Sequence, residues 1–120
     1  MTEERLTAFG EAWNAHDTDL VMSYMADDCV FHASVGPDLL GRTYVGAGDV
    51  RRGVQAFFDR YPDGRFDDGQ VFVAGDRGAS EWTFSWTGED GERVAVRGCD
   101  LFEFDGDLIK VKNAFRKNRV

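Results

Sequence analysis

The fold is decided by a stretch near the C-terminal end of the chain, RVAVRGCDLFEFDGDLIKVKNAFR at residues 93–116. Apolar and polar residues alternate along it with a period of two, which predicts strands rather than helices. Asp105-Gly106 divides the stretch into strands at 93–104 and 108–116, because this dipeptide favours a tight hairpin turn. The same alternation predicts two earlier strands, at 70–74 and 80–87. The second half of the chain is therefore predicted to be an antiparallel meander.

The first half of the chain has helical periodicity. Leu6, Phe9 and Trp13 recur at the spacing of one helix face, after Thr2 as the predicted N-cap. Three further elements are expected: a short helix from Asp17 that ends at Asp27-Asp28, a strand at 29–34, and a helix that starts with Asp49 as N-cap and stops at Pro62.

Helices and strands that are segregated along a chain predict the α+β class. We expect a single domain over residues 1–120, built as a cone-shaped curved antiparallel sheet with three helices covering its concave face, a cystatin-like α+β barrel. The strand at 29–34 is expected to pair at an edge. A ferredoxin-like α/β barrel would need a helix between the late strands, and no helical period occurs between Gln70 and Arg116.

Composition excludes several classes of partner. The 120 residues carry 22 acidic residues against 14 Lys and Arg, a formal net charge of −8. Nucleic acid and anionic membrane surfaces are not expected partners, because both require clustered basic residues. The longest uncharged stretch, residues 29–37, is far shorter than the roughly 18 residues that span a bilayer. Two widely separated cysteines form no disulfide framework, which favours a reducing cytoplasm.

Four segments carry a resemblance to a known family. They are FGEAWNAHD at 9–17, YMADDCVF at 24–31, the segment at 46–58, and GCDLFEFDG at 98–106 followed by LIKV. In this order they resemble the nuclear transport factor two-like superfamily, in its SnoaL-like and ketosteroid-isomerase-like branch. The resemblance covers nearly the whole chain and implies a cone-shaped, often dimeric α+β barrel. Members are isomerases, aldol-type cyclases, dehydratases, epoxide hydrolases or proteins without catalytic activity, so the fold alone does not give the function.

Asp100 is the strongest functional candidate. Its neighbours on the same face of the predicted strand are apolar or small: Val94, Val96, Gly98 and Phe102. A carboxylate there needs a partner or holds a proton, because burying an unpaired charge is costly. The resemblance implies the acid of an oxyanion hole, as in ketosteroid isomerases, or the acid/base carboxylate of SnoaL-like cyclases. The alternative is a structural aspartate bonded to a neighbouring strand, to Arg97 or to Arg116.

The other catalytic groups of ketosteroid isomerases do not carry over. Counting from Asp27-Asp28, Phe9 occupies the position of their tyrosine donor and Ala33 that of their aspartate base. His32 lies one residue away, and an offset of one residue reverses the face of a strand. It is either a base reached through a local bulge or a residue on the outer face. Isomerisation of 3-oxosteroids is therefore not expected.

Two further polar residues depend on the orientation of their strands. Packing favours the aromatic set of the strand at 80–87 inside; with its polar set inside, Glu81 and Asp100 would form a carboxylate pair. Asn113 has the parity of Val111 and Phe115, which predicts that it faces the cone, either as a hydrogen-bonding group for a ligand or as a partner of the backbone.

Aromatic residues are numerous enough either to line a ligand cavity or simply to fill the core. The candidate lining residues are Phe9, Trp13, Phe31, Phe57, Phe58, Trp82, Phe102 and Phe115.

No metal or cofactor is expected. Cys29 and His32 have an odd spacing on a strand, which sends their side chains to opposite faces. Gly46-x-Gly48 lacks the strand-turn-helix context of a dinucleotide site. Cys99 is predicted to be a packing residue on the face opposite Asp100.

Two functions remain open from the sequence. One is a non-catalytic SnoaL-like protein that binds an apolar small molecule in the cone. The other is a cofactor-free isomerase, cyclase, dehydratase or hydrolase of an apolar carbonyl or hydroxy compound, with Asp100 as acid/base or oxyanion donor, helped by His32, Glu81 or Asn113. A homodimer through the outer sheet face is also expected, because that face of the strand at 93–104 is partly apolar.

Overall fold

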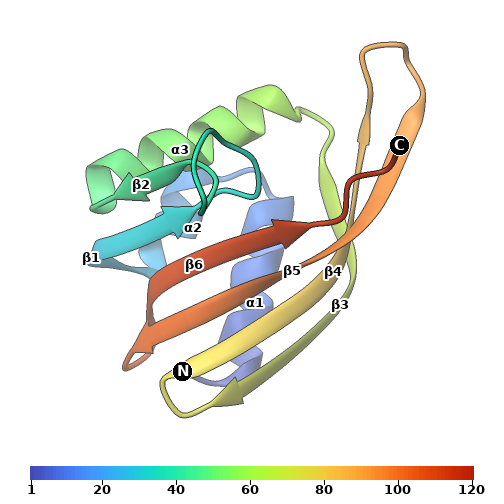
Figure 1. Cartoon of the computed structure of the whole chain (residues 1–120). Coiled ribbons are helices and arrows are strands. Elements are labelled where there is room, and N and C mark those ends of the chain that lie inside the picture. The colour runs from blue at the N-terminus through green and yellow to red at the C-terminus, as the bar shows by residue number, and fades with distance from the viewer.

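The computed structural model describes all 120 residues and contains three helices and one six-stranded sheet (Figure 1). The helices are α1 (Glu3–Asn14), α2 (Thr18–Ser23) and α3 (Ala47–Arg60). The strands are β1 (Met25–His32), β2 (Thr43–Val45), β3 (Arg65–Ala74), β4 (Arg77–Thr87), β5 (Arg93–Asp105) and β6 (Leu108–Arg116). The α+β class, the curved sheet and the three helices confirm the predicted fold. None of the helices combines the length and the apolar character needed to cross a membrane.

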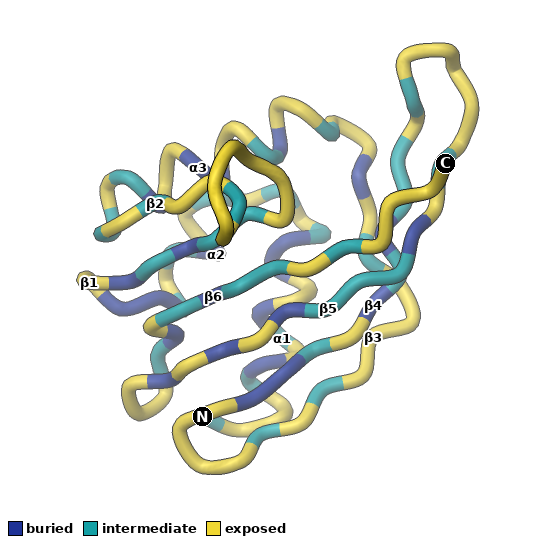
Figure 2. The backbone as a smooth tube through the Cα atoms, in the orientation of Figure 1, coloured by how far each residue is buried: buried dark blue, intermediate teal, exposed yellow.

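The sheet has the order β2-β1-β6-β5-β4-β3. Its four late strands form the predicted antiparallel meander, and β1 pairs with β6 at the edge of that meander. The β1–β6 pairing is parallel, and a short strand that the sequence did not indicate, β2, pairs with β1 beyond it. The helices lie on one face of the sheet (Figure 1). Buried and exposed residues alternate along several strands, as expected for a sheet with one covered face (Figure 2).

Two of the predicted N-caps are confirmed. The Thr2 hydroxyl accepts a hydrogen bond from the Arg5 amide, and the Asp17 carboxylate accepts one from the Leu20 amide, both at 3.1 Å. The third helix instead begins at Ala47, after Gly46 as its N-cap residue. Asp49 lies in its first turn, where the carboxylate accepts the Val45 amide at 3.0 Å, so the prediction of Asp49 as the N-cap was wrong.

Asp27-Asp28 does not end a helix. Helix α2 ends at Ser23 and these two residues lie within β1, whose register shifts between Met25 and Val30. Lys110 of β6 donates to the Asp28 carboxylate at 2.8 Å and holds the pKa of that carboxyl below its usual range. The aspartates are compatible with a strand because they are solvent-exposed and one of them is paired across the sheet.

A bulge in β6 changes which of its side chains face the helices. Phe104 pairs with Ile109, but Glu103 pairs with Val111, so Lys110 is an additional residue on β6. Ile109 and Lys112 are therefore both buried, although their numbers differ in parity. The prediction that Asn113 and Phe115 face the cone was wrong for this reason: both lie on the outer face, where Phe115 is 47% exposed.

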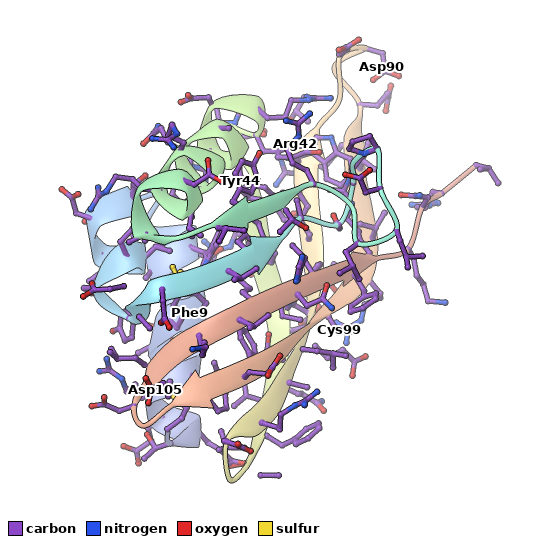
Figure 3. All side chains as sticks on the ribbon, turned by 60° about the vertical axis from the view of Figure 1, so that its left-hand side comes forward. Phe9, Arg42, Tyr44, Asp90, Cys99 and Asp105 are labelled. Atoms are coloured by element: carbon purple, nitrogen blue, oxygen red, sulfur yellow. The ribbon has the colours of Figure 1, made fainter.

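The core between the helices and the sheet is mainly aromatic. Trp13 of α1 makes edge-on contacts with Phe31, Phe57, Phe58 and Phe66, at centroid distances of 5.3–6.3 Å. Figure 3 shows Phe9 on the helical side of the sheet, Tyr44 beside α3, and Asp90 at the far tip of the β4–β5 hairpin. The predicted face of α1 is confirmed, since Leu6, Phe9 and Trp13 are all buried.

Asp63 binds the two residues that flank the β4–β5 loop, Thr87 and Arg93. Because these contacts lower its pKa, the pH dependence of stability can test them. Its carboxylate accepts from the Thr87 hydroxyl at 2.5 Å, the Thr87 amide at 3.2 Å and Arg93 at 2.8 Å. The hydrogen bonds from Thr87 hold the pKa of Asp63 below its ordinary value of 3.8. Because the folded-state pKa is the lower one, the contribution to stability is complete above the unfolded value and is lost as the pH falls through the folded one.

We expect Asp63→Asn to lower the free energy of unfolding at neutral pH, with a difference from wild type that shrinks as the medium is acidified from about pH 7 to about pH 2. Denaturant unfolding across this range measures it. Thr87→Val, which removes one of the donors, should weaken the same pH dependence. A constant difference at all pH values would contradict the role given to the carboxylate.

Candidate functional site

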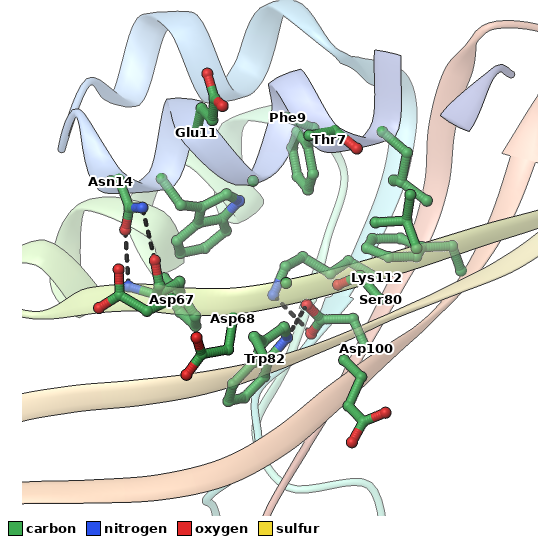
Figure 4. Close-up of a pocket in the computed structure, with 18 of the residues that line it drawn as sticks. Thr7, Phe9, Glu11, Asn14, Asp67, Asp68, Ser80, Trp82, Asp100 and Lys112 are labelled. Carbon is green, nitrogen blue, oxygen red and sulfur yellow. Dashed lines mark hydrogen bonds and ion pairs between the residues drawn. The ribbon is translucent and has the colours of Figure 1, made fainter. Parts of the chain in front are cut away.

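An ion pair that is almost wholly removed from solvent lies at the centre of the sheet's inner face. The Lys112 ammonium of β6 is 3.0 Å from Asp100 Oδ1 of β5, and the two residues are 5% and 4% exposed. The other carboxylate oxygen, Asp100 Oδ2, accepts from the Trp82 indole Nε1 at 3.0 Å. Figure 4 shows these three side chains converging from three neighbouring strands. Asp100 therefore faces the cone, and its cationic partner is Lys112 rather than Arg97 or Arg116.

Gly98 allows the contact between Trp82 and Asp100. Gly98 and Trp82 are directly opposite on β5 and β4, and Asp100 is the next residue on the same face of β5. A Cβ atom on Gly98 would collide with the Trp82 ring. The absence of a side chain at this position thus lets the indole lie flat across β5 and direct its N–H to the carboxylate.

Aromatic rings surround the other side of the Lys112 ammonium. Its Nζ lies 4.4 Å from the ring centroid of Trp13 and 4.8 Å from that of Phe31, within the range of cation–π attraction. An ammonium has three N–H donors, and Asp100 is the one hydrogen-bond acceptor that Lys112 has in the protein. Lys112 is therefore a fixed cation with donor capacity left over.

A cavity of about 360 Å³ opens between α1 and the strands β3 and β4. Asp100, Lys112 and Trp82 form its floor, with Phe9 and Trp13 from α1 on the opposite wall (Figure 4). Its outer part is polar and mainly acidic, with residues Glu11, Asp67, Asp68 and Arg65.

Helix α1 is attached to the wall of this cavity by a reciprocal pair of hydrogen bonds. The Asn14 side chain donates to the Phe66 carbonyl and accepts from the Phe66 amide, each at 2.8 Å (Figure 4). Just beyond, Asp68 adopts a left-handed conformation with φ of 55° where the β3 register shifts. This irregularity bends β3 and gives the cavity its outer rim.

The indole N–H of Trp13 is the one buried side-chain polar atom that has no hydrogen-bond partner. An unsatisfied buried donor costs about 1–3 kcal/mol. Trp13 also lines the cavity, so this unpaired donor lies in a residue of the site.

A second cavity of about 190 Å³ lies on the other side of Lys112, between α3 and the C-terminal part of β6. Its lining is largely apolar and includes Phe31, Tyr44, Phe57, Phe84 and Ala114. The two cavities have four lining residues in common: Trp13, Phe66, Trp82 and Lys112. Lys112 is thus accessible from both.

Most of the predicted aromatic residues lie around these cavities. Phe9, Trp13, Trp82 and Phe102 line the first, and Phe31 and Phe57 line the second. Phe58 is buried in the core, where it stacks on His16, and it lines neither. The expectation that the aromatic set of β4 faces inward is confirmed, since Trp82 and Phe84 are buried.

Two of the predicted catalytic residues do not meet Asp100. His32 lies on the outer face of β1, opposite the buried Phe31, and its Nδ1 is 2.7 Å from the Thr43 hydroxyl. Glu81 is among the residues at the edge of the first cavity, but its carboxylate is bonded to Arg97 at 2.6 Å on the outer face of β4 and β5. The carboxylate pair of Glu81 and Asp100 therefore does not form, because the two residues point to opposite faces.

Lys112 is the residue that the sequence did not reveal. Simple alternation from Val111 places it outside, and the bulge at Lys110 moves it inside. The available signal was chemical: a buried carboxylate needs a cation, and Lys112 was one of the basic residues on the neighbouring strand.

The thiols and the remaining acids offer no further reactive group. Burial raises the pKa of the Cys99 thiol, and the Asp100 and Glu81 carboxylates add to this effect. Burial also raises the pKa of Cys29. No three His, Cys, Asp or Glu side chains are grouped so that they could hold a metal ion.

The family model described as a SnoaL-like domain matches residues 6–111. The chain belongs to this family. No curated protein matches it. The fold is shared by solved structures that cover nearly the whole of both chains.

A candidate polyketide cyclase from Xanthomonas campestris pv. campestris has a TM-score of 0.80 at 20% identity, over 96% of this chain and 88% of that one. A nuclear transport factor two-like protein of unknown function from Mesorhizobium loti has a TM-score of 0.76 at 28% identity, over 96% and 89%. TerC, co-crystallised with polyporic acid, has a TM-score of 0.78 at 16% identity, over 95% and 89%. These neighbours confirm the SnoaL-like fold.

A double-mutant cycle tests the buried ion pair. Asp100→Ala leaves the Lys112 ammonium buried without its counter-ion, and we expect a loss of about 3–5 kcal/mol in the free energy of unfolding. Lys112→Met should lower the free energy of unfolding by a similar amount. The double variant should be more stable than either single variant, because no unpaired charge remains buried. The exposed pair of Asp28 and Lys110 is the control, with a much smaller coupling. Additive effects at Asp100 and Lys112 would contradict the pairing.

Proposed function

We propose that this SnoaL-like protein binds a small, largely apolar molecule that carries a carbonyl or hydroxyl oxygen, and that it does so without transforming it. The observation that carries the proposal is the buried pair of Asp100 and Lys112, set between a cavity with aromatic residues at its inner end and a second, largely apolar cavity. Ligand pockets commonly combine an apolar lining with a few fixed polar groups. The molecule would bind against Lys112, which lines both cavities, of about 360 and 190 Å³; the larger is near the lower end of the usual range for such pockets.

The polar group with unused hydrogen-bonding capacity at the inner end of the site is a donor. Lys112 has N–H groups beyond the one bonded to Asp100. A carbonyl or hydroxyl oxygen of the ligand would accept from Lys112, while its apolar body contacts Phe9 and Phe102. The candidate polyketide cyclase and the TerC complex with polyporic acid add support for an oxygen-bearing organic ligand.

A cofactor-free enzyme is the second candidate. It is favoured by a carboxylate and an ammonium that line the same cavity, since such a pair can exchange protons with a ligand. Asp100 would be the acid/base or oxyanion donor. His32, Glu81 and Asn113 give it no help, because their side chains lie on the outer face. This incomplete set of acid and base groups makes binding without catalysis the better-supported function.

Binding can be measured with 2-acetonaphthone, a neutral aromatic ketone, through quenching of tryptophan fluorescence. Because hydrogen bonds from charged groups contribute about 1.5–3 kcal/mol, the double variant Asp100→Asn/Lys112→Met should bind about tenfold more weakly or worse. The matched control is Asp28→Asn/Lys110→Met, which removes an exposed pair outside both cavities and should bind as wild type does. Equal binding by both double variants, or no binding by wild type, would overturn the proposal.

The same ketone distinguishes the two candidate functions. In deuterated buffer its methyl protons exchange through the enolate, and proton NMR follows the loss of their signal. We expect the wild-type protein to leave the buffer rate unchanged. Acceleration that is lost in Asp100→Asn would instead identify Asp100 as a base and support the enzyme.

We also propose that the protein forms a homodimer through the outer face of its sheet. The proposed location is a reducing cytoplasm, which agrees with two free cysteines. Three large apolar residues are exposed on this face: Phe72 at 60%, Leu101 at 45% and Phe115 at 47%. Phe72, Ala79 and Leu101 are consecutive partners across three strands, so the apolar surface is continuous. Twofold symmetry would place this surface against its copy.

For the dimer we expect light scattering at micromolar concentration to give twice the 13.5 kDa of one chain. Leu101→Glu should convert it to monomer, because the twofold axis brings two like charges into the apolar contact. Leu39→Glu is the control, at an exposed leucine of the loop between β1 and β2. A monomeric wild type, or a dimer unaffected by Leu101→Glu, would refute this interface.

A further inference from the structure

The second cavity differs from the first in the charge of its lining. Seventeen residues line it, and none of them is Asp or Glu. The cations among them are Lys112 at the inner end and two arginines, Arg60 at the end of α3 and Arg116 at the end of β6. The charge of Lys112 is balanced by Asp100, but the two arginines have no carboxylate partner. In a chain of net charge −8, they make the electrostatic potential at this cavity locally positive.

The two arginines are held by aromatic rings rather than by carboxylates. The Arg116 guanidinium lies 5.1 Å from the ring centroid of Trp86 and 5.7 Å from that of Tyr61, and Arg60 lies 5.0 Å from the Tyr61 ring. Neither forms an ion pair, whereas arginines elsewhere, such as Arg93 and Arg97, do. Both terminal nitrogens of Arg116 donate to the Tyr61 hydroxyl, but at 3.4 Å these are long hydrogen bonds. The oxygens of an anion would replace this hydroxyl with shorter, charge-assisted hydrogen bonds.

The mouth of the first cavity has the opposite character. It carries Glu11, Asp67 and Asp68, and its Arg65 is already bonded to Asp67 at 3.0 Å. An anionic group is repelled there and attracted at the second cavity. The charge difference therefore orients a ligand that has a charged end and an apolar body.

We propose that the ligand is an aromatic anion whose carboxylate or enolate oxygens bind Arg60 and Arg116, with its ring system directed inward along Phe57 and Trp13 toward Lys112. This inference rests on the proposed binding function and specifies the class of ligand. A guanidinium presents paired N–H donors that match the two oxygens of a carboxylate, and charge-assisted hydrogen bonds of this kind are among the stronger ones in proteins.

Two probes of nearly equal shape test the charge requirement. 2-Naphthoate carries a carboxylate where 2-acetonaphthone carries a methyl ketone, and tryptophan quenching gives the dissociation constant of each. Wild type should bind 2-naphthoate at least about tenfold more tightly than 2-acetonaphthone. Added salt should weaken the binding of 2-naphthoate and leave the binding of 2-acetonaphthone unchanged. Arg116→Gln and Arg60→Gln should each reduce this preference, and the double variant should abolish it.

Arg77→Gln is the matched control, because Arg77 is an exposed arginine in no ion pair and outside both cavities. It should keep the preference of wild type. Circular dichroism and thermal melting show whether the arginine variants are folded. Equal affinity of wild type for the two probes, or a preference that survives in the double variant, overturns the inference while the binding function stands. Failure of both probes to bind wild type overturns the binding function and this inference together.

Discussion

A carboxylate and an ammonium group, both removed from water, meet on the inner face of the sheet between β5 and β6. Taking each ion out of water costs several kcal/mol, and their attraction offsets this only when the remaining hydrogen-bonding capacity is used. Here the offset comes from the Trp82 N–H on one carboxylate oxygen and from the rings of Trp13 and Phe31 around the ammonium. A pair of apolar residues of similar volume would serve stability at least as well. The stability of the fold therefore does not require this pair, which agrees with the proposed role of the pair in binding a ligand.

The surrounding structure is arranged so that this pair can form. Gly98 removes the side chain that would keep the Trp82 indole away from Asp100. The additional residue at Lys110 rotates the second half of β6, which brings Lys112 to the inner face and sends Asn113 outward. Asn14 fixes the end of α1 to β3, and this helix carries Trp13 over the ammonium. Each of these features is local, but they act on a single site because three neighbouring strands of one sheet carry Trp82, Asp100 and Lys112.

The acidic surface disfavours large anionic partners, whereas the second cavity, which carries Arg60 and Arg116, favours a small anion. A net charge of −8 disfavours nucleic acid and anionic membranes, as the composition alone indicates. That argument concerns the whole surface and does not extend to a cavity lined by Lys112, Arg60 and Arg116. Asp100 balances the charge of Lys112, so Arg60 and Arg116 dominate within the cavity, since exposed charges farther away than about 10 Å are largely screened at ordinary salt concentrations.

The sequence by itself determined the α+β class, the antiparallel meander and the strongest candidate residue of the site. Alternation in residues 93–116 and the helical spacing of Leu6, Phe9 and Trp13 depend on local periodicity, so the α+β class followed from them. Asp100 was identifiable because a carboxylate among apolar neighbours on one strand face is expected to be buried and then needs either a partner or a proton. Only the tertiary structure shows that the partner of Asp100 is Lys112. A single bulge at Lys110 reverses the parity of every later residue in β6, and its presence depends on how β5 and β6 pair rather than on the residues of β6. For the same reason the positions of His32 and Glu81 relative to Asp100, and the meeting of Arg60 and Arg116 at one cavity, became visible only once the strands and helices were placed together.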